Sequence, residues 1–186
     1  MSHMLRIPNV TTGTEDCLAR IRIACEYGTS PRELVLAAVP EVEFRIDAMI
    51  RDAALNSNMK KCRIGEFFIE EKLSSYFQTW AARESFLTGV FDCNLSGITI
   101  GQNFKLLVEI RNSLVHGNGS LTALQTKSLQ SLIKIRGNLE KVFDLQVDGT
   151  RLMLDSLDRR KVSDVACEYL IFIDQSIAEY HLNDEK

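Results

Sequence analysis

Signals that begin an α-helix recur along this chain, and they limit its fold more than any other feature. Residues 30–33 read Ser-Pro-Arg-Glu, which combines an N-cap serine, a proline at the first helical position and a glutamate three residues after the cap. Thr12 and Glu15 form a second start signal, an S/T-x-x-E capping box. Apolar residues follow both signals at helical spacing. The sequence therefore predicts an all-α fold.

Helical periodicity continues along most of the chain and predicts a bundle of about five to six helices. Pro40 should kink or split the second helix, because proline lacks a backbone donor and clashes with the preceding turn. The third helix carries an aromatic stripe from Phe67 to Phe91, which we expect in the core rather than at a ligand site. The expected helices span residues 12–27, 31–56, 64–91, 104–115, 121–142 and 158–180, with a loop at 92–101.

The hydrophobic period changes from that of a helix to that of a strand between residues 143 and 154. Asp148-Gly149 at the centre of this segment is typical of a two-residue type I′ turn. Such a turn places the apolar side chains of both strands on one face. The sequence therefore predicts one small β-hairpin, at about residues 143–154, before the C-terminal helix. The expected pairs are Val147 with Thr150, Leu145 with Leu152, and Phe143 with Leu154.

The composition is that of one globular domain over residues 1–186, with 45% hydrophobic and 25% charged residues and no shift along the chain. Residues 1–11 are expected to be flexible, and Ser2-His3-Met4 resembles a cloning remnant. The net charge of −3 lacks the basic excess of proteins that hold long duplex DNA by its phosphates. The composition tolerates a nucleic-acid substrate but does not by itself indicate one.

The five cysteines show no C-x-x-C or metal-finger spacing, and their odd number does not suit a secreted disulfide framework. We expect them to be reduced and mostly buried, which predicts a cytoplasmic protein. No secretory signal is recognised, and the longest apolar run is too short to cross a membrane. Phosphate-binding loops, dinucleotide fingerprints, serine-hydrolase elbows and zinc-protease motifs are also missing. The sequence therefore predicts neither a cofactor nor a metal.

The segment from Glu109 to Gly119 is where the sequence suggests chemistry. On a helical wheel, Arg111 falls in the middle of the apolar face. A guanidinium at such a position needs a carboxylate, a phosphate or a wet cleft, because an unpaired buried charge is costly. His116 directly precedes Gly117, where the helix should end. Its imidazole could simply be a C-cap that interacts with the helix dipole.

The pattern Arg111-Asn112-x-x-x-His116, near the end of an apolar helix, resembles the R-x(4–6)-H motif of HEPN domains. The hairpin and closing helix resemble most the RiboL-PSP-HEPN branch of that family. The resemblance implies a single HEPN-like domain that cleaves RNA without a metal. The ribose 2′-hydroxyl would attack the adjacent phosphorus and leave a 2′,3′-cyclic phosphate and a 5′-hydroxyl. One family variant carries a modified tyrosine two places after the histidine, where this chain has Asn118.

The implied catalytic residues are Arg111, His116 and Asn112. His116 would transfer protons, since an imidazole changes charge near neutral pH. Arg111 would hold the phosphate and stabilise the charge of the transition state. Asn112 would orient the histidine or the phosphate. The chain is thus expected to be an endoribonuclease of the toxin or phage-defence type, with RNA as substrate and an antitoxin or another regulatory partner.

Two other interpretations stay open. The chain could be a non-catalytic HEPN domain that binds RNA, a nucleotide or a partner protein, or a helical interaction module in which Arg111 forms a buried ion pair. A homodimer through the motif helix is also expected, because residues five apart lie about 140° apart around a helix. Arg111 and His116 then converge if the helix unwinds at Gly117 or if a second chain supplies one group. A dimer would also cover Leu107 and Leu114.

Overall fold

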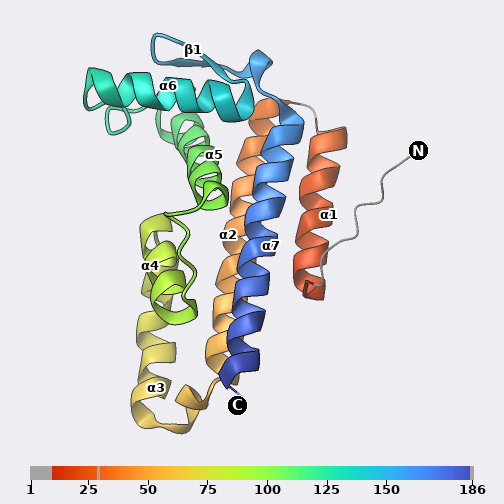
Figure 1. The fold of residues 1–186 in the computed structure, drawn as a ribbon, viewed down its shortest axis with the longest axis vertical. Coiled ribbons are helices and arrows are strands. Elements are labelled where there is room, and N and C mark those ends of the chain that lie inside the picture. Colours follow the sequence, from red (N-terminus) through yellow and green to blue (C-terminus); the bar gives the residue numbers. More distant parts are fainter. Residues whose placement is uncertain (1–9, 29, 185–186) are drawn as a thin grey trace.

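The computed structural model describes residues 10–28 and 30–184 of the chain. Seven α-helices and one two-stranded antiparallel sheet make up its regular structure over these residues, apart from short 3₁₀ and π segments (Figure 1). The all-α bundle with one small hairpin before the last helix is therefore confirmed. The elements are α1 (Thr12–Tyr27), α2 (Pro31–Asn56), α3 (Arg63–Phe67), α4 (Trp80–Phe91), α5 (Thr99–His116), α6 (Leu129–Phe143), β1 (Gln146–Asp148), β2 (Arg151–Met153) and α7 (Arg159–Asp184).

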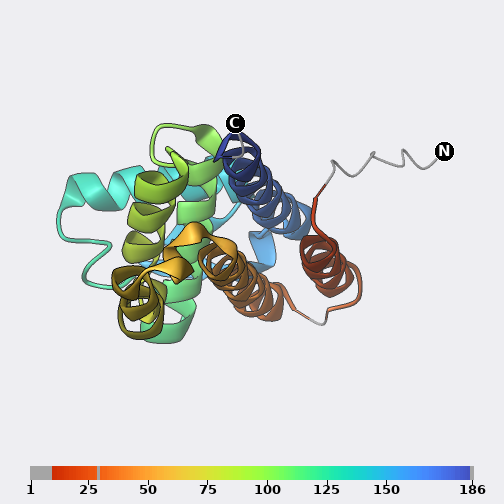
Figure 2. The same cartoon turned by 90° about the horizontal axis from the view of Figure 1, so that it is seen from below.

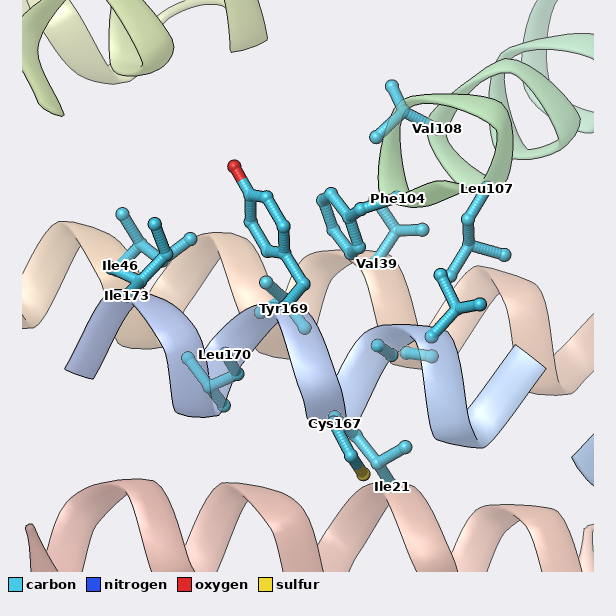
Figure 3. Packing of buried hydrophobic residues seen from close by; sticks show 14 of the residues in the cluster. Ile21, Val39, Ile46, Phe104, Leu107, Val108, Cys167, Tyr169, Leu170 and Ile173 are labelled. Carbon is cyan, nitrogen blue, oxygen red and sulfur yellow. The ribbon is translucent and has the colours of Figure 1, made fainter. Parts of the chain in front are cut away.

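Helices α1, α2 and α7 pack against one another as a three-helix layer. Figure 2 shows the three nearly end-on, at the corners of a triangle. Helix α5 packs on α2 and α7, and α6 lies across the end of this layer (Figure 1). The centre of the core is the contact of α5 with α7, where the rings of Phe104 and Tyr169 stack at 4.0 Å between centroids. Val39 and Ile46 of α2 line the same cluster and are fully buried (Figure 3). Each such aliphatic side chain stabilises the fold by about 2 kcal/mol.

The predicted N-cap of α2 is confirmed, whereas that of α1 is shifted by one residue. The Ser30 hydroxyl accepts a hydrogen bond from the backbone N–H of Glu33 at 3.2 Å. Helix α2 continues through Pro40, so the proline does not split it. The N-cap of α1 is Thr11 rather than Thr12, and no side chain caps it. The Thr11 hydroxyl instead donates to Asp174 at 2.6 Å, which ties the start of α1 to α7.

Residues 1–9, most of the segment expected to be flexible and the apparent cloning remnant, lie outside the described residues. Thr11, which belonged to the same expectation, is placed by its bond to Asp174. Among the described residues, no helix is long and apolar enough to cross a membrane.

The prediction of one long helix over 64–91 is wrong. The 3₁₀ segment η1 (Asn58–Lys61) precedes α3, and a π-helical segment η2 (Phe68–Lys72) and a 3₁₀ segment η3 (Leu73–Phe77) separate α3 from α4. Thr79 has an extended backbone and caps α4 by accepting from the N–H of Ala82. Arg83 binds the carbonyl of Phe77 and both carboxylate oxygens of Asp47. These bonds stabilise a break that apolar periodicity alone does not indicate.

The aromatic stripe of that segment is only partly in the core. Phe86 and Phe91 are buried, whereas Phe67 is 55% exposed. Helix α5 begins at Thr99 rather than at 104, so the loop before it is shorter than expected. Helix α6 begins at Leu129 rather than at 121, because residues 121–128 form turns.

The predicted hairpin exists, but its register is shifted by two residues. The observed pairs are Gln146 with Met153, Val147 with Leu152, and Asp148 with Arg151. Gly149, with φ +57°, is the first of the two turn residues, and the second has no positive φ, as in a type II′ turn. A shift of two keeps Val147 and Leu152 buried on one face. The N–H of Leu152 also donates to the carbonyl of Gly119 at 2.9 Å, which fixes β2 against the chain after α5.

The core assignment predicts a strong contrast between two phenylalanines. Phe104→Ala removes a ring that is 1% exposed and stacked on Tyr169, so we expect a loss of about 3–5 kcal/mol in the free energy of unfolding. Phe67→Ala is the matched control at an exposed site and should cost about 0.5 kcal/mol or less. Urea denaturation followed by circular dichroism measures both. Equal costs would contradict the assigned core.

Candidate functional site

Arg111, Asn112 and His116 line one cleft of about 560 Å³. The cleft lies between α5 and the segment that runs from the end of η3 into α4. The three residues that the sequence singled out are therefore brought together within one chain. The full lining is Glu43, Phe77, Gln78, Thr79, Trp80, Ala81, Arg83, Glu84, Lys105, Val108, Glu109, Arg111, Asn112 and His116.

Arg111 lies at the edge of the buried face of α5. Its neighbours Ile110 and Leu114 are buried, whereas its own side chain is half-buried. The guanidinium Nη1 donates to the Asn112 side-chain oxygen at 3.2 Å. Within the described part of the chain, no carboxylate lies within the 4.0 Å of an ion pair with Arg111. The arginine thus faces the cleft without a partner that neutralises its charge.

Asn112 is half-buried next to Arg111, and its side chain contacts that arginine. The sequence assigned its amide to the histidine or to a phosphate. In the structure the amide oxygen accepts from Arg111. Since the oxygen restricts the guanidinium, Asn112 orients the arginine.

His116 is the last residue of α5, and its side chain is exposed at the edge of the cleft. The carbonyl of Ser113 accepts hydrogen bonds from the N–H groups of Gly117 and Gly119, both at 3.0 Å. Asn118 has a φ of +49°, so the chain turns away sharply after the helix. A methyl group at Gly117 would overlap the carbonyl oxygen of Ser120. The turn beside His116 therefore requires glycine.

A partly buried polar network holds the segment after His116 against α5. The Gln125 amide donates to the carbonyl of Glu109 at 2.9 Å and to its carboxylate. The Gln125 side-chain oxygen accepts from the N–H of Thr122 at 2.6 Å and from the hydroxyl of Ser113 at 3.0 Å. Ser113 is fully buried. The sequence did not predict this network, because a helix was expected from residue 121 and Gln125 belongs to no recognised motif.

Four charged residues of the cleft were also missed. Arg83 is 6% exposed and binds Asp47 at 2.7 and 2.9 Å. Burial raises the pKa of the Glu84 carboxyl, and the charge of Lys105 partly offsets this effect. Glu43 lies 3.9 Å from Arg83. These side chains reach the cleft from α2, α4 and α5. The spacing of residues in the sequence does not indicate that these three helices meet here.

The described residues contain no cluster of three histidine, cysteine or acidic side chains that could hold a metal ion. The five cysteines are free, and Cys17, Cys93 and Cys167 are buried. This agrees with the expectation of reduced, mostly buried thiols. No protein-family model, curated protein or solved structure matches the chain. The chemistry available to the chain is therefore inferred from the cleft itself.

The tight turn after His116 makes a prediction about stability. Gly117→Ala introduces a methyl group into the Ser120 carbonyl, so we expect a loss of about 1–3 kcal/mol in the free energy of unfolding. Gly137→Ala, in α6 with open space around it, is the matched control and should gain about 0.5–1 kcal/mol. Thermal and urea unfolding measure both variants. A Gly117→Ala protein as stable as the parent would show that the turn is not as tight as described.

Proposed function

We propose that the chain is a metal-independent endoribonuclease of the HEPN type. The observation that carries this proposal is the cleft that collects Arg111, Asn112 and His116, with an arginine that no carboxylate of the described chain neutralises. A half-buried, unneutralised guanidinium is a suitable receptor for a phosphate group. An imidazole at the edge of the same cleft can exchange protons with a bound substrate and with water.

The proposed reaction needs no group beyond these side chains. The ribose 2′-oxygen attacks the neighbouring phosphorus, and the bond from phosphorus to the 5′-oxygen breaks. One proton leaves the 2′-hydroxyl and one is delivered to the departing 5′-oxygen, and His116 transfers protons in this exchange. Arg111 donates to the non-bridging oxygens, whose negative charge grows in the transition state. Asn112 holds the guanidinium in position. The products are a 2′,3′-cyclic phosphate and a 5′-hydroxyl.

The substrate class follows from this chemistry. The attacking 2′-hydroxyl is present in RNA and absent from DNA. A cytoplasmic ribonuclease must be restrained until it is needed. The proposal therefore includes a toxin or phage-defence role and a regulatory partner such as an antitoxin.

A homodimer through α5 belongs to the same proposal, with a different contact surface from the one first expected. Leu107 and Leu114 are 0% and 2% exposed within a single chain, so they need no second chain to cover them. Apolar side chains that remain exposed on α5 and in the chain after it include Val115, Leu124, Leu129 and Ile133, at 48%, 76%, 72% and 62%. A twofold axis beside Val115 would bring two copies of this surface together.

The catalytic assignment predicts the loss of activity on a single substitution. His116→Ala should lower the rate of RNA cleavage in EDTA by at least about a hundredfold, because the proton-transfer group is removed. The measurement uses purified protein, labelled RNA and analysis of the product ends. His181→Ala, near the C-terminal end of α7, is the matched histidine control and should keep full activity.

Arg111→Lys serves as the second arm of the same assay. It keeps the positive charge but loses the planar fork of donors. Most activity should therefore disappear, although the lysine can still attract the phosphate of the substrate. Full activity of His116→Ala in a preparation free of contaminating ribonuclease would exclude the mechanism. Binding of RNA without cleavage by the unmodified chain would instead support the non-catalytic alternative.

The dimer is tested by mixing inactive chains. Arg111→Ala and His116→Ala proteins are each expected to be inactive, and mixing them restores part of the activity only if the site is composite, with one group supplied by each chain. Sedimentation of the unmodified protein should give the mass of two chains, and Val115→Glu should shift it to one. A single-chain mass at working concentration, together with no recovery on mixing, would rule out the dimer.

A further inference from the structure

A second groove adjoins the cleft across α5. It has a volume of about 940 Å³ and lies between α5, α6 and α7. Lys105 and Glu109 line both the groove and the cleft, so the two hollows share one wall. A chain-like ligand that occupies the cleft can therefore continue over Lys105 into the groove.

Helix α6 presents a stripe of hydrogen-bond donors to this groove. The side chains are spaced three, four and three residues apart, which places them on one face of the helix. None of them is acidic. Lys134 and Lys141 are exposed, and neither forms an ion pair with a described carboxylate. The stripe consists of Ser131, Lys134, Asn138 and Lys141.

The acidic residues of the groove lie on other helices. Asp164 and Glu168 belong to α7, and Glu109 belongs to α5. Lys161 of α7 also lines the groove, but its ammonium group is held by Asp144 at 2.8 Å. Lysines that form no ion pair with a described carboxylate therefore lie on the α6 wall, whereas Lys105 at the shared wall also interacts with the Glu84 carboxyl. Because the whole chain has a net charge of −3, attraction for an anion must come from such local groups.

The lining of the cleft also favours one kind of polyanion, a nucleic-acid strand whose bases are unpaired. Phe77 and Trp80 contribute aromatic rings to this lining, and both are only partly buried. The Arg51 guanidinium lies over the ring of Phe77 at 4.7 Å and that of Arg83 over the ring of Trp80 at 5.3 Å, so a base would have to use the opposite ring faces. Aromatic rings stack on bases that are not paired, and a lysine-lined groove beside them tracks the phosphates of a single strand. A duplex offers neither free base faces nor a backbone that bends into two adjoining hollows.

We propose that the α5–α6–α7 groove binds the strand that flanks the scissile phosphate, and that the substrate is single-stranded RNA. The strand crosses α5 at Lys105, and Lys134 and Lys141 hold its phosphates. The two lysines are seven positions apart, a rise of about 10 Å along α6, which spans more than one nucleotide of an extended strand. The inference rests on the proposed ribonuclease function, whose scissile phosphate is placed at Arg111.

The experiment measures binding separately from cleavage. The His116→Ala chain, which should not cut RNA, is titrated against an unstructured fluorescent RNA of about twenty nucleotides, longer than the site of a single small fold. Anisotropy is recorded over a range of salt concentrations. Adding Lys134→Gln and Lys141→Gln removes two phosphate contacts, so the slope of log affinity against log salt should fall by about 1.4. At low salt the affinity should fall by about tenfold or more.

The control removes the same charge elsewhere. Lys60→Gln with Lys61→Gln changes two exposed lysines in η1, at the opposite end of the molecule from α6 (Figure 1), and should leave slope and affinity unchanged. If the two double substitutions have equal effects on binding, or if the α6 double substitution has none, the proposed role of the groove is wrong while the ribonuclease proposal stays intact. Equally tight binding of a duplex of the same sequence would overturn the single-strand assignment. If the His116→Ala chain binds no RNA and the parent cuts none, the proposed function itself has failed.

Discussion

The position of His116 depends on how the chain leaves α5. The carbonyl of Ser113 accepts from the N–H groups of Gly117 and Gly119, which ends the helix directly after the histidine. Two further constraints hold this turn: Gln125 binds the α5 backbone at Glu109, and β2 donates to the carbonyl of Gly119. The hairpin is therefore part of the support of the cleft, although none of its residues lines the cleft.

This support explains why the hairpin register could not be obtained from its own sequence. The alternating apolar residues fit registers that differ by two residues equally well, since both keep the same face buried. The bond from Leu152 to Gly119 and that from Leu121 to the carbonyl of Thr150 select between them. Those partners lie about thirty residues away along the chain, and a period-based prediction considers only neighbours.

The other helices and the cleft show the same difference between features set by neighbouring residues and features set by distant contacts. Start signals contained within four residues, such as Ser30 with Glu33, gave the correct beginning of α2. The break between α3 and α4 depends on Arg83, which binds Asp47 of α2, so apolar spacing gave one helix where two exist. In the site, the wheel placed Arg111 on the apolar side of α5, and the structure has it at the edge of that side. The remaining charged residues of the cleft come from α2, α4 and another turn of α5, and only tertiary packing relates them.

The acidic residues of the cleft bear directly on whether it can accept a phosphate. Glu43 lies 3.9 Å from Arg83, and the Glu109 carboxylate accepts from the Gln125 amide. Burial raises the pKa of Glu84, so this carboxyl gains a proton more readily as the pH falls. Each acid is thus paired, hydrogen-bonded or made easier to neutralise, whereas Arg111 forms no ion pair with a described residue and donates to the uncharged amide of Asn112. Because neighbouring charges act more strongly in a half-buried cleft than in water, the proposed function needs only the arginine end of the cleft to attract an anion, and the acidity of the whole chain does not oppose it there.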